Sequence, residues 1–359
     1  MDRRSGKPAP GTSLGARRRA IVAAAAIVFA ACSGTGGAVS NPPSGPPTSS
    51  AASGAPSQAG TTVSGTIELY TSVSQPTVDA ELNGLHALYP NLKVSVFRAP
   101  TGQINARIAA DERTGGLQAD VVWFSDPLSM QALAQRDLLL NWTPDDLSGI
   151  PVGFRTPSFF GAAVLYVVLV AHAGLSPMPV SWQDLTNPAY KDAVVMPDPG
   201  FAGSAFGALG FFSQTAGYGT DFYARLKANG TVQVQAPDDV VSGVAQGRYK
   251  VGITIDKSAQ IAIAKGSPVT SIWPEPGAIA VYSPIAVATS SRNPAAAKAF
   301  VEFVLSLAGQ RAVASTAAHP ARTDSGGPPV GGPVVSIDWS RAYGQQVQLL
   351  QDYRSLFGG

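Results

Sequence analysis

An alternation of strand-like and helix-like segments begins at residue 63 and narrows the folds open to this chain more than any other feature. Residues 66–71 alternate polar and apolar side chains as a β-strand does, and residues 77–89 repeat apolar side chains at helical spacing. A strand over 93–97, a helix over 103–113 and an apolar strand over 119–124 are expected next. Strands that alternate with helices form βαβ units, so we predict an α/β fold with a largely parallel sheet.

The same alternation resumes after residue 160. We expect strands over 161–170, 194–196, 232–234, 251–255 and 279–289, and helices over 203–212, 218–228, 238–246, 294–308 and 339–356. Residues 319–332 are rich in proline and glycine, so we expect irregular chain there.

Residues 1–32 have the pattern of an export signal. Three arginines precede an apolar run over 20–31, and these 12 residues would span only about 18 Å as a helix, too short for a bilayer core of about 30 Å. The run ends at Cys32, the only cysteine of the chain, and residues 29–32 resemble a bacterial lipobox, in which the cysteine is lipidated. A signal peptide with an unmodified thiol is the alternative, and the arginines leave Sec and twin-arginine export both open.

Residues 33–62 are almost entirely Ser, Gly, Pro, Ala and Thr. Such a composition cannot bury enough apolar surface to offset its ordering entropy, so we predict a disordered tether. The basic signal also distorts the net charge of +2. Without the six cations and one anion of residues 1–31, the totals of 25 and 23 become 19 and 22, a net charge of −3. No basic patch remains, and we expect no nucleic-acid partner.

Four sequence blocks carry a family resemblance. They are LYTS at 69–72, ADVVWFSDP at 119–127, SWQDLTNPAYK at 181–191 with MPDP at 196–199, and NPAAAKAFVEFV at 293–304. In this order they resemble the bacterial extracellular solute-binding proteins that include receptors for ferric iron and 2-aminoethylphosphonate.

The resemblance implies a two-lobed, periplasmic-binding-protein-like fold of type II, in which each lobe is a mixed, mostly parallel sheet flanked by helices and the ligand cleft lies between the lobes. Lobe 1 would be 63–162 plus 282–359, and lobe 2 would be 163–281. The implied function is that of a monomeric, lipid-anchored receptor on the outer face of the cytoplasmic membrane. It would capture a small organic anion or zwitterion, such as a phosphonate, by hinge closure and deliver it to the permease and ATPase of an ABC-type importer. A ferric-iron receptor and a sensory binding protein of the same fold are the alternatives.

Small polar residues follow the predicted strands and open the predicted helices. Open α/β sheets bind ligands beyond the carboxyl ends of their strands, and helix N-termini and hydroxyl groups suit an anionic ligand. The alternative for each residue alone is an ordinary helix cap. The candidate ligand-binding residues of this kind are Ser72, Thr101, Ser125, Asp126 and Ser204.

Asp256 and Lys257 follow the predicted strand 251–255 and are the charged candidates. Lys257 would bind an acid group and Asp256 an amine; a solvated turn is the alternative. The resemblance implies that ferric receptors hold iron with adjacent tyrosines at this place. Tyr249 and Tyr282 are the nearest tyrosines in sequence and have no tyrosine neighbour, so we predict that bare ferric iron is not the ligand.

Enzymatic function is disfavoured. His86, His172 and His319 are far apart in sequence and lack metal-ligand spacing. The residues around Ser204 lack the glycines of a nucleophile elbow, and the chain has no phosphate-binding loop. The sequence therefore favours a binding protein without cofactor or resident metal over an exported hydrolase.

Overall fold

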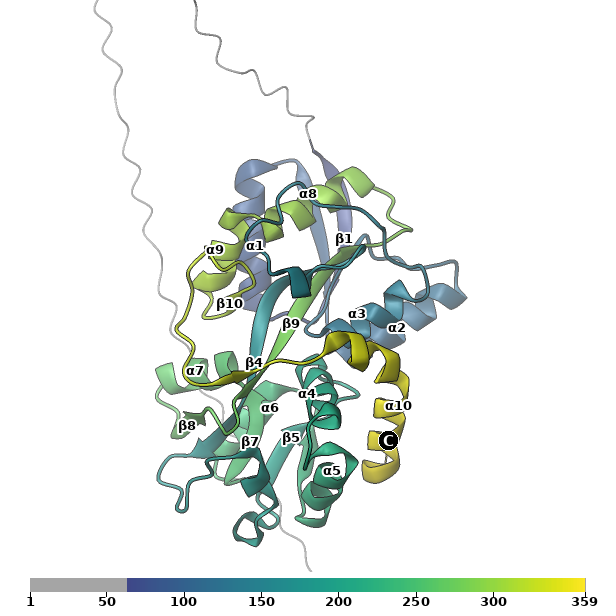
Figure 1. The fold of residues 1–359 in the computed structure, drawn as a ribbon. Helices are drawn as coiled ribbons and strands as arrows, with labels where there is room; N and C mark the ends of the chain where they lie inside the picture. The colour runs from purple at the N-terminus through teal and green to yellow at the C-terminus, as the bar shows by residue number, and fades with distance from the viewer. Residues whose placement is uncertain (1–62, 359) are drawn as a thin grey trace, which may run out of the picture. The chain divides into compact units, whose positions relative to one another are not determined.

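The computed structural model describes residues 63–358 (Figure 1). The predicted export signal, Cys32 and the predicted tether lie outside these residues. Within 63–358, no helix is both long and apolar enough to cross a membrane.

The first elements alternate as the sequence predicts and end in a long strand. They are β1 (Gly65–Thr71), α1 (Gln75–Leu88), β2 (Leu92–Arg98), α2 (Thr101–Arg113), β3 (Val121–Trp123), α3 (Pro127–Ala134) and β4 (Phe160–His172), with a 3-10 turn at Val152–Phe154. Two 3-10 turns, Trp182–Thr186 and Pro188–Tyr190, lead into the next group. It comprises β5 (Val194–Pro197), α4 (Gly203–Gln214), α5 (Gly219–Ala228), β6 (Val232–Val234), α6 (Pro237–Ala245), β7 (Val251–Ile255), α7 (Asp256–Ala264), β8 (Val269–Ile272) and β9 (Ala278–Val287). The chain ends with α8 (Pro294–Leu305), α9 (Leu307–Ser315), β10 (His319–Pro320), β11 (Val334–Val335) and α10 (Trp339–Phe357).

One mixed sheet joins all of these strands. Its main order is β2-β1-β3-β9-β4-β7-β5-β6, and β8, β10 and β11 pair with β4 or β9. β1 is parallel to β2 and β3, and β5 is parallel to β6 and β7. In the centre, β9 and β4 are antiparallel to their neighbours in this order, and only the short β11 pairs with β9 in parallel. The predicted parallel arrangement therefore holds at both ends of the sheet and not in its centre. We call β2, β1 and β3 with α1, α2, α3, α8 and α9 the β1 side, and β7, β5 and β6 with α4 to α7 the β5 side; they form the upper and lower parts of Figure 1.

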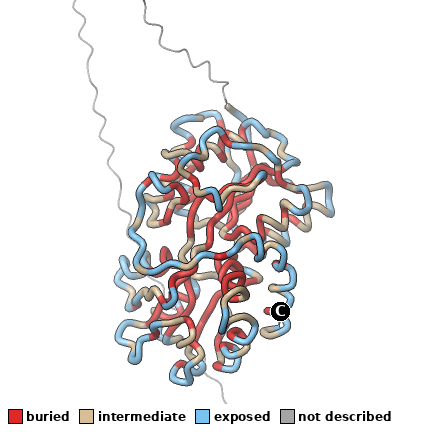
Figure 2. Tube along the Cα trace, in the orientation of Figure 1, coloured by how far each residue is buried: buried red, intermediate tan, exposed pale blue. Residues whose placement is uncertain are grey.

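The two long central strands contribute to the hydrophobic cores of both sides. In β4, Phe160 and Ala162 pack in the core of the β1 side, and Val167 and Leu169 pack in the core of the β5 side. β9 is divided in the same way and is buried along nearly its whole length (Figure 2). The strands β4 and β9 therefore connect the two sides and stabilise both.

The C-terminal helix α10 packs on both sides. It contacts α3 of the β1 side and α4 and α5 of the β5 side. Gln346 in α10 donates to Gln135 Oε1 after α3 at 2.7 Å, and Gln233 in β6 donates to the Tyr353 hydroxyl at 2.6 Å. The last helix thus links the two sides along a second route, outside the sheet.

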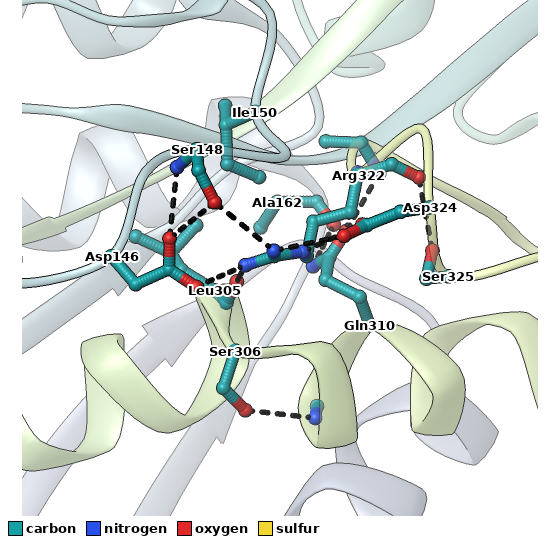
Figure 3. A network of polar contacts seen from close by, with 12 residues as sticks. Asp146, Ser148, Ile150, Ala162, Leu305, Ser306, Gln310, Arg322, Asp324 and Ser325 are labelled. Atoms are coloured by element: carbon teal, nitrogen blue, oxygen red, sulfur yellow. Dashed lines mark hydrogen bonds and ion pairs between the residues drawn. The ribbon is translucent and has the colours of Figure 1, made fainter.

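A polar network fixes the chain where it leaves α9 (Figure 3). The fully buried Gln310 side chain donates to Ala162 O and Val304 O at 2.7 and 2.8 Å and accepts from the N–H groups of Ala321 and Arg322 at 2.7 and 3.0 Å. The guanidinium of Arg322 pairs with Asp146 and Asp324, each at 2.8 Å. The hydrogen bond from the Ser148 hydroxyl, followed by that from Arg322, holds the pKa of Asp146 below its usual range, and the hydrogen bonds from Arg322 do the same for Asp324. The network joins α9 and the chain after it to β4 and to Asp146, so we assign it a structural role.

Several elements differ from the sequence prediction. The helix expected over 294–308 is two helices, because the chain turns at Ser306, whose hydroxyl accepts from Gly309 N–H at 3.2 Å and caps α9. Helices α3 and α7 were not predicted. The turn or charged pair expected at Asp256 and Lys257 is the first turn of α7.

Candidate ligand-binding site between the two sides

Three hydroxyl groups from separate segments of the β1 side meet at one point. Thr101 Oγ1 donates to Ser72 Oγ at 2.9 Å, and Ser72 Oγ donates to Ser125 Oγ at 3.1 Å. The Thr101 and Ser125 hydroxyls lie 3.2 Å apart, and Ser125 N–H donates to Ser72 Oγ at 2.9 Å. Ser72 follows β1, Ser125 follows β3 and Thr101 opens α2, so the parallel strands bring these residues to one edge of the sheet.

Asp126 extends this hydroxyl cluster with a buried carboxyl group. Its Oδ1 accepts from Ser129 N–H at 2.7 Å and caps α3. Its Oδ2 is buried and has no hydrogen-bond partner among the described residues. Burial raises the pKa of Asp126 to about 7, although the hydrogen bonds from Ser129 oppose this shift. Asp126 is therefore both a helix cap and an acceptor with one free oxygen.

The N-terminus of α4, from the β5 side, lies directly on this cluster. A Cβ atom added to Gly203 would come within 2.3 Å of Asp126 Oδ2 and 2.6 Å of Ser125 Oγ. Close by, Gly102 N–H donates across the contact to Phe201 O at 3.2 Å. The predicted residue Ser204 is buried in the first turn of α4, and no side chain caps that helix. The backbone of α4 on the β5 side thus lies against the side chains of the β1 side. Only glycine leaves enough room for this contact at position 203.

Lys257 crosses the contact in the opposite direction. It opens α7 on the β5 side, and its ammonium donates to Ser74 Oγ and Thr77 Oγ1, both at 2.7 Å, and to Thr316 Oγ1 at 3.3 Å. These three hydroxyls belong to the start of α1 and the end of α9 on the β1 side. Burial lowers the pKa of Lys257 to about 8, against a smaller raising effect of the Asp238 charge. A buried cation is therefore held by neutral oxygens.

Asp256 has protein partners for both oxygens. His319 Nε2 lies 3.3 Å from its Oδ2, while Gln260 Nε2 at 3.1 Å and Ser271 Oγ at 3.3 Å donate to Oδ1. Burial raises the pKa of Asp256, but these hydrogen bonds, above all that with His319, outweigh it and hold the pKa below its usual value. The amine-binding role predicted for Asp256 stays a prediction, and the carboxylate already has its hydrogen bonds.

Two tyrosine hydroxyls meet near Asp126, although they are far apart in sequence. The hydroxyls of Tyr282 in β9 and Tyr343 in α10 lie 2.6 Å apart. Burial raises the pKa of Tyr343 to about 12 and that of Tyr282 further, and the negative charge of Asp126 contributes to both shifts. Sequence reasoning found no tyrosine neighbour for Tyr282, because this pair exists only through the packing of α10.

A sequence profile of the bacterial extracellular solute-binding proteins matches residues 67–316, that is, 250 of the 359 residues. The chain belongs to this family. The match covers both sides of the sheet and every residue of the contact described above except His319 and Tyr343, and Thr316 is its last position.

Individual relatives are distant. This solute-binding protein is 25% identical over 212 residues to the phosphoglycerate transport regulatory protein PgtC of Salmonella typhimurium, which covers 56% of this chain and 53% of that protein. It thus spans about half the length of PgtC.

Solved structures with the same fold agree over most of the chain. The periplasmic binding protein AfuA from Actinobacillus pleuropneumoniae, with fructose-6-phosphate bound, aligns with a TM-score of 0.71 at 20% identity over 80% of this chain and 97% of AfuA. Iron-bound HitA from Pseudomonas aeruginosa aligns with a TM-score of 0.71 at 21% identity over 81% of this chain and 99% of HitA. This solute-binding protein therefore has the type II periplasmic-binding-protein fold that the sequence predicted.

The solute-binding protein brings most of its predicted site residues to one contact. Ser72, Thr101, Ser125 and Asp126 form one group against the start of α4, and Lys257 reaches the same β1–α1 loop through Ser74. Sequence reasoning did not find two threonines of this contact, Thr77 and Thr316. Thr77 could have been found as a polar residue in the first turn of α1, whereas Thr316 reaches the site only through packing. No group of three or more His, Cys, Asp or Glu residues within 63–358 could hold a metal ion.

Proposed function

We propose that this protein is the solute-binding receptor of an ABC-type importer and that its ligand is a small organic anion or zwitterion such as a phosphonate. The surroundings of Lys257 carry this proposal. A buried ammonium is costly unless its charge is compensated, and no carboxylate of residues 63–358 forms an ion pair with it. An acid group of a ligand would supply the missing charge, and the hydroxyls of Ser74, Thr77 and Thr316 can turn to donate to its oxygens.

The names of two similar proteins support an acidic, phosphorylated ligand. PgtC is named for phosphoglycerate transport, and AfuA holds fructose-6-phosphate. Both compounds combine a phosphate group with a small polar carbon skeleton. A phosphonate presents the same kind of tetrahedral, charged oxygen group to Lys257.

Hinge closure is the mechanism that we propose for capture. Lobe 1 would comprise 63–162 plus 282–359, lobe 2 would comprise 163–281, and β4 and β9 would form the hinge between them. The contacts of Lys257 with α1 and of Gly203 with Asp126 would be broken on opening, and a ligand would then enter between the groups that they join.

Substitution of Lys257 tests the proposal directly. Lys257→Met keeps the length of the side chain and removes its charge, so affinity for 2-aminoethylphosphonate, measured by isothermal titration calorimetry, should fall roughly tenfold to a hundredfold. The matched control is Lys265→Met, at the exposed end of the same helix α7, which should bind as the wild type does. Wild-type affinity in the Lys257→Met variant would contradict the proposal.

Export and anchoring complete the proposed function. The signal over 1–32 would direct export, Cys32 would carry the lipid, and the receptor would act as a monomer on the outer face of the cytoplasmic membrane beside its permease and ATPase. Cys32→Ala should abolish labelling with radioactive palmitate and release the protein into the soluble fraction. Retention of the variant in the membrane fraction would count against a lipid anchor at this residue.

A ferric-iron receptor is the second candidate, because the hydroxyls of Tyr282 and Tyr343 form a pair and HitA is an iron-bound protein of the same fold. Tyrosine binds Fe³⁺ as phenolate, and the raised pKa of both residues opposes that form. We therefore rank iron behind an organic solute.

A further inference from the structure

Asp126 has a hydrogen-bonding capacity that the protein does not use. The residue is fully buried, and only Oδ1 has a partner, the N–H of Ser129. Oδ2 is buried without one among the described residues. Leaving a buried acceptor unpaired destabilises a protein, so a partner that arrives with a ligand would bind favourably.

The free oxygen points at the contact between the two sides. Gly203 lies over Oδ2 so closely that a Cβ there would come within 2.3 Å. Separation of α4 from α3 would therefore uncover Oδ2 from the β5 side. The other groups around it are the hydroxyls of Ser125, Tyr282 and Tyr343, so Asp126 is the acidic residue of this cluster.

The position of Asp126 relative to Lys257 gives the site two unlike ends. Lys257 binds the β1–α1 loop through Ser74, and the hydroxyl of Ser72 in the same loop binds Ser125, the residue before Asp126. The Lys257 end of the contact therefore carries a positive charge, and the Asp126 end offers a hydrogen-bond acceptor. Asp256 does not provide this second end, because its two oxygens already accept hydrogen bonds.

We propose that Asp126 Oδ2 accepts a hydrogen bond from an ammonium or hydroxyl group of the ligand, whose acid group binds Lys257. This inference rests on the proposed function and adds the ligand class: a small acid that also carries a hydrogen-bond donor. A simple alkyl acid would leave Oδ2 unpaired and bind less well, because a site with a polar group discriminates against analogues that lack its partner.

Three probes of nearly equal size test the inference: ethylphosphonate, 2-hydroxyethylphosphonate and 2-aminoethylphosphonate. In calorimetry the wild type should bind at least one donor-bearing probe roughly tenfold to a hundredfold more tightly than ethylphosphonate. Asp126→Asn keeps an oxygen to cap α3, since asparagine is an equally good cap, but it replaces Oδ2 with an NH₂ group. The variant should lose the preference for a donor while it still binds ethylphosphonate.

The control is Asp338→Asn, which makes the same change at the exposed cap of α10 and should keep the wild-type order. A preference for the ammonium probe alone identifies a zwitterion, and a preference for both donor probes identifies a hydroxylated acid as well; either supports the inference. Equal affinity of the wild type for all three probes overturns the inference and leaves the proposed function intact. Binding of none of them overturns both, and if Asp126→Asn fails to fold, the order of the probes on the wild type decides alone.

Discussion

Glu81 offers a quantitative test of the structure that does not depend on the ligand. It lies in α1, one turn after Thr77, and both of its carboxyl oxygens are buried without a partner among the described residues. Burial raises the pKa of Glu81 well above its ordinary value of 4.5. The native state therefore keeps the proton at pH values where the unfolded chain has lost it.

The sign and the size of the effect follow by linkage. Because the pKa is raised on folding, the stabilisation is complete below the unfolded pKa and is lost as the pH rises toward the folded pKa. Each pH unit between the unfolded and the folded pKa lowers the free energy of unfolding by about 1.4 kcal/mol. Glu81→Gln cannot titrate and should lack this loss.

Urea unfolding of the wild type and of Glu81→Gln between about pH 5 and pH 7 measures the difference. Any packing cost of the glutamine is the same at every pH, so the slope of the difference is the readout. The control is Asp79→Asn on the exposed face of the same helix, where the carboxylate accepts only from Gln75 at 2.8 Å. A difference between wild type and Glu81→Gln that stays constant with pH would refute a buried, protonated Glu81.

Three further results are expected. Gly203→Ala should hold the two sides apart in the absence of ligand and so give a larger radius of gyration by X-ray scattering. Gly210→Ala in the same helix, where a Cβ meets its nearest neighbour at 3.5 Å, should match the wild type, and equal behaviour of the two variants would refute this. Gln310→Ala should lower the free energy of unfolding, measured in urea, by about 3 kcal/mol or more, because two buried carbonyl groups and two N–H groups lose their partner. A loss below about 1 kcal/mol would mean that water replaces the side chain. Ferric citrate should produce no visible tyrosinate-to-iron absorption band, since the phenols of Tyr282 and Tyr343 resist deprotonation; such a band would revive the iron receptor.

Much of the fold could be predicted from local pattern. The strands β1, β2, β5, β6 and β7 lie within about two residues of the predicted ranges, because alternation and β-branched runs are local signals. Helix α7 was missed because β7 passes into it at Asp256 without a breaker residue between them. Helix α3 was missed although Asp126 and Pro127 form a typical helix start, since the helix has only eight residues.

Some residues of the candidate site could likewise be predicted from local pattern, and others could not. Ser72, Thr101 and Ser125 could be found because each ends a strand or opens a helix in a parallel sheet, and topology brings such positions together. The partner of Asp256 could not, because His319 lies 63 residues away. The same holds for Tyr282 and Tyr343, which are 61 residues apart and meet only when α10 packs across the two sides.

The shared strands β4 and β9 also limit how a gene for such a receptor can change. A fragment that encodes one side alone would leave half of each strand without its core and would expose Val167 and Leu169, or Phe160 and Ala162, to water. Recombination that exchanges a single side with a related gene must therefore cut within both strands and match the side chains on either side of each cut. We therefore expect the two sides to be inherited together. New ligand preferences are expected to arise by point substitution at the contact between the sides.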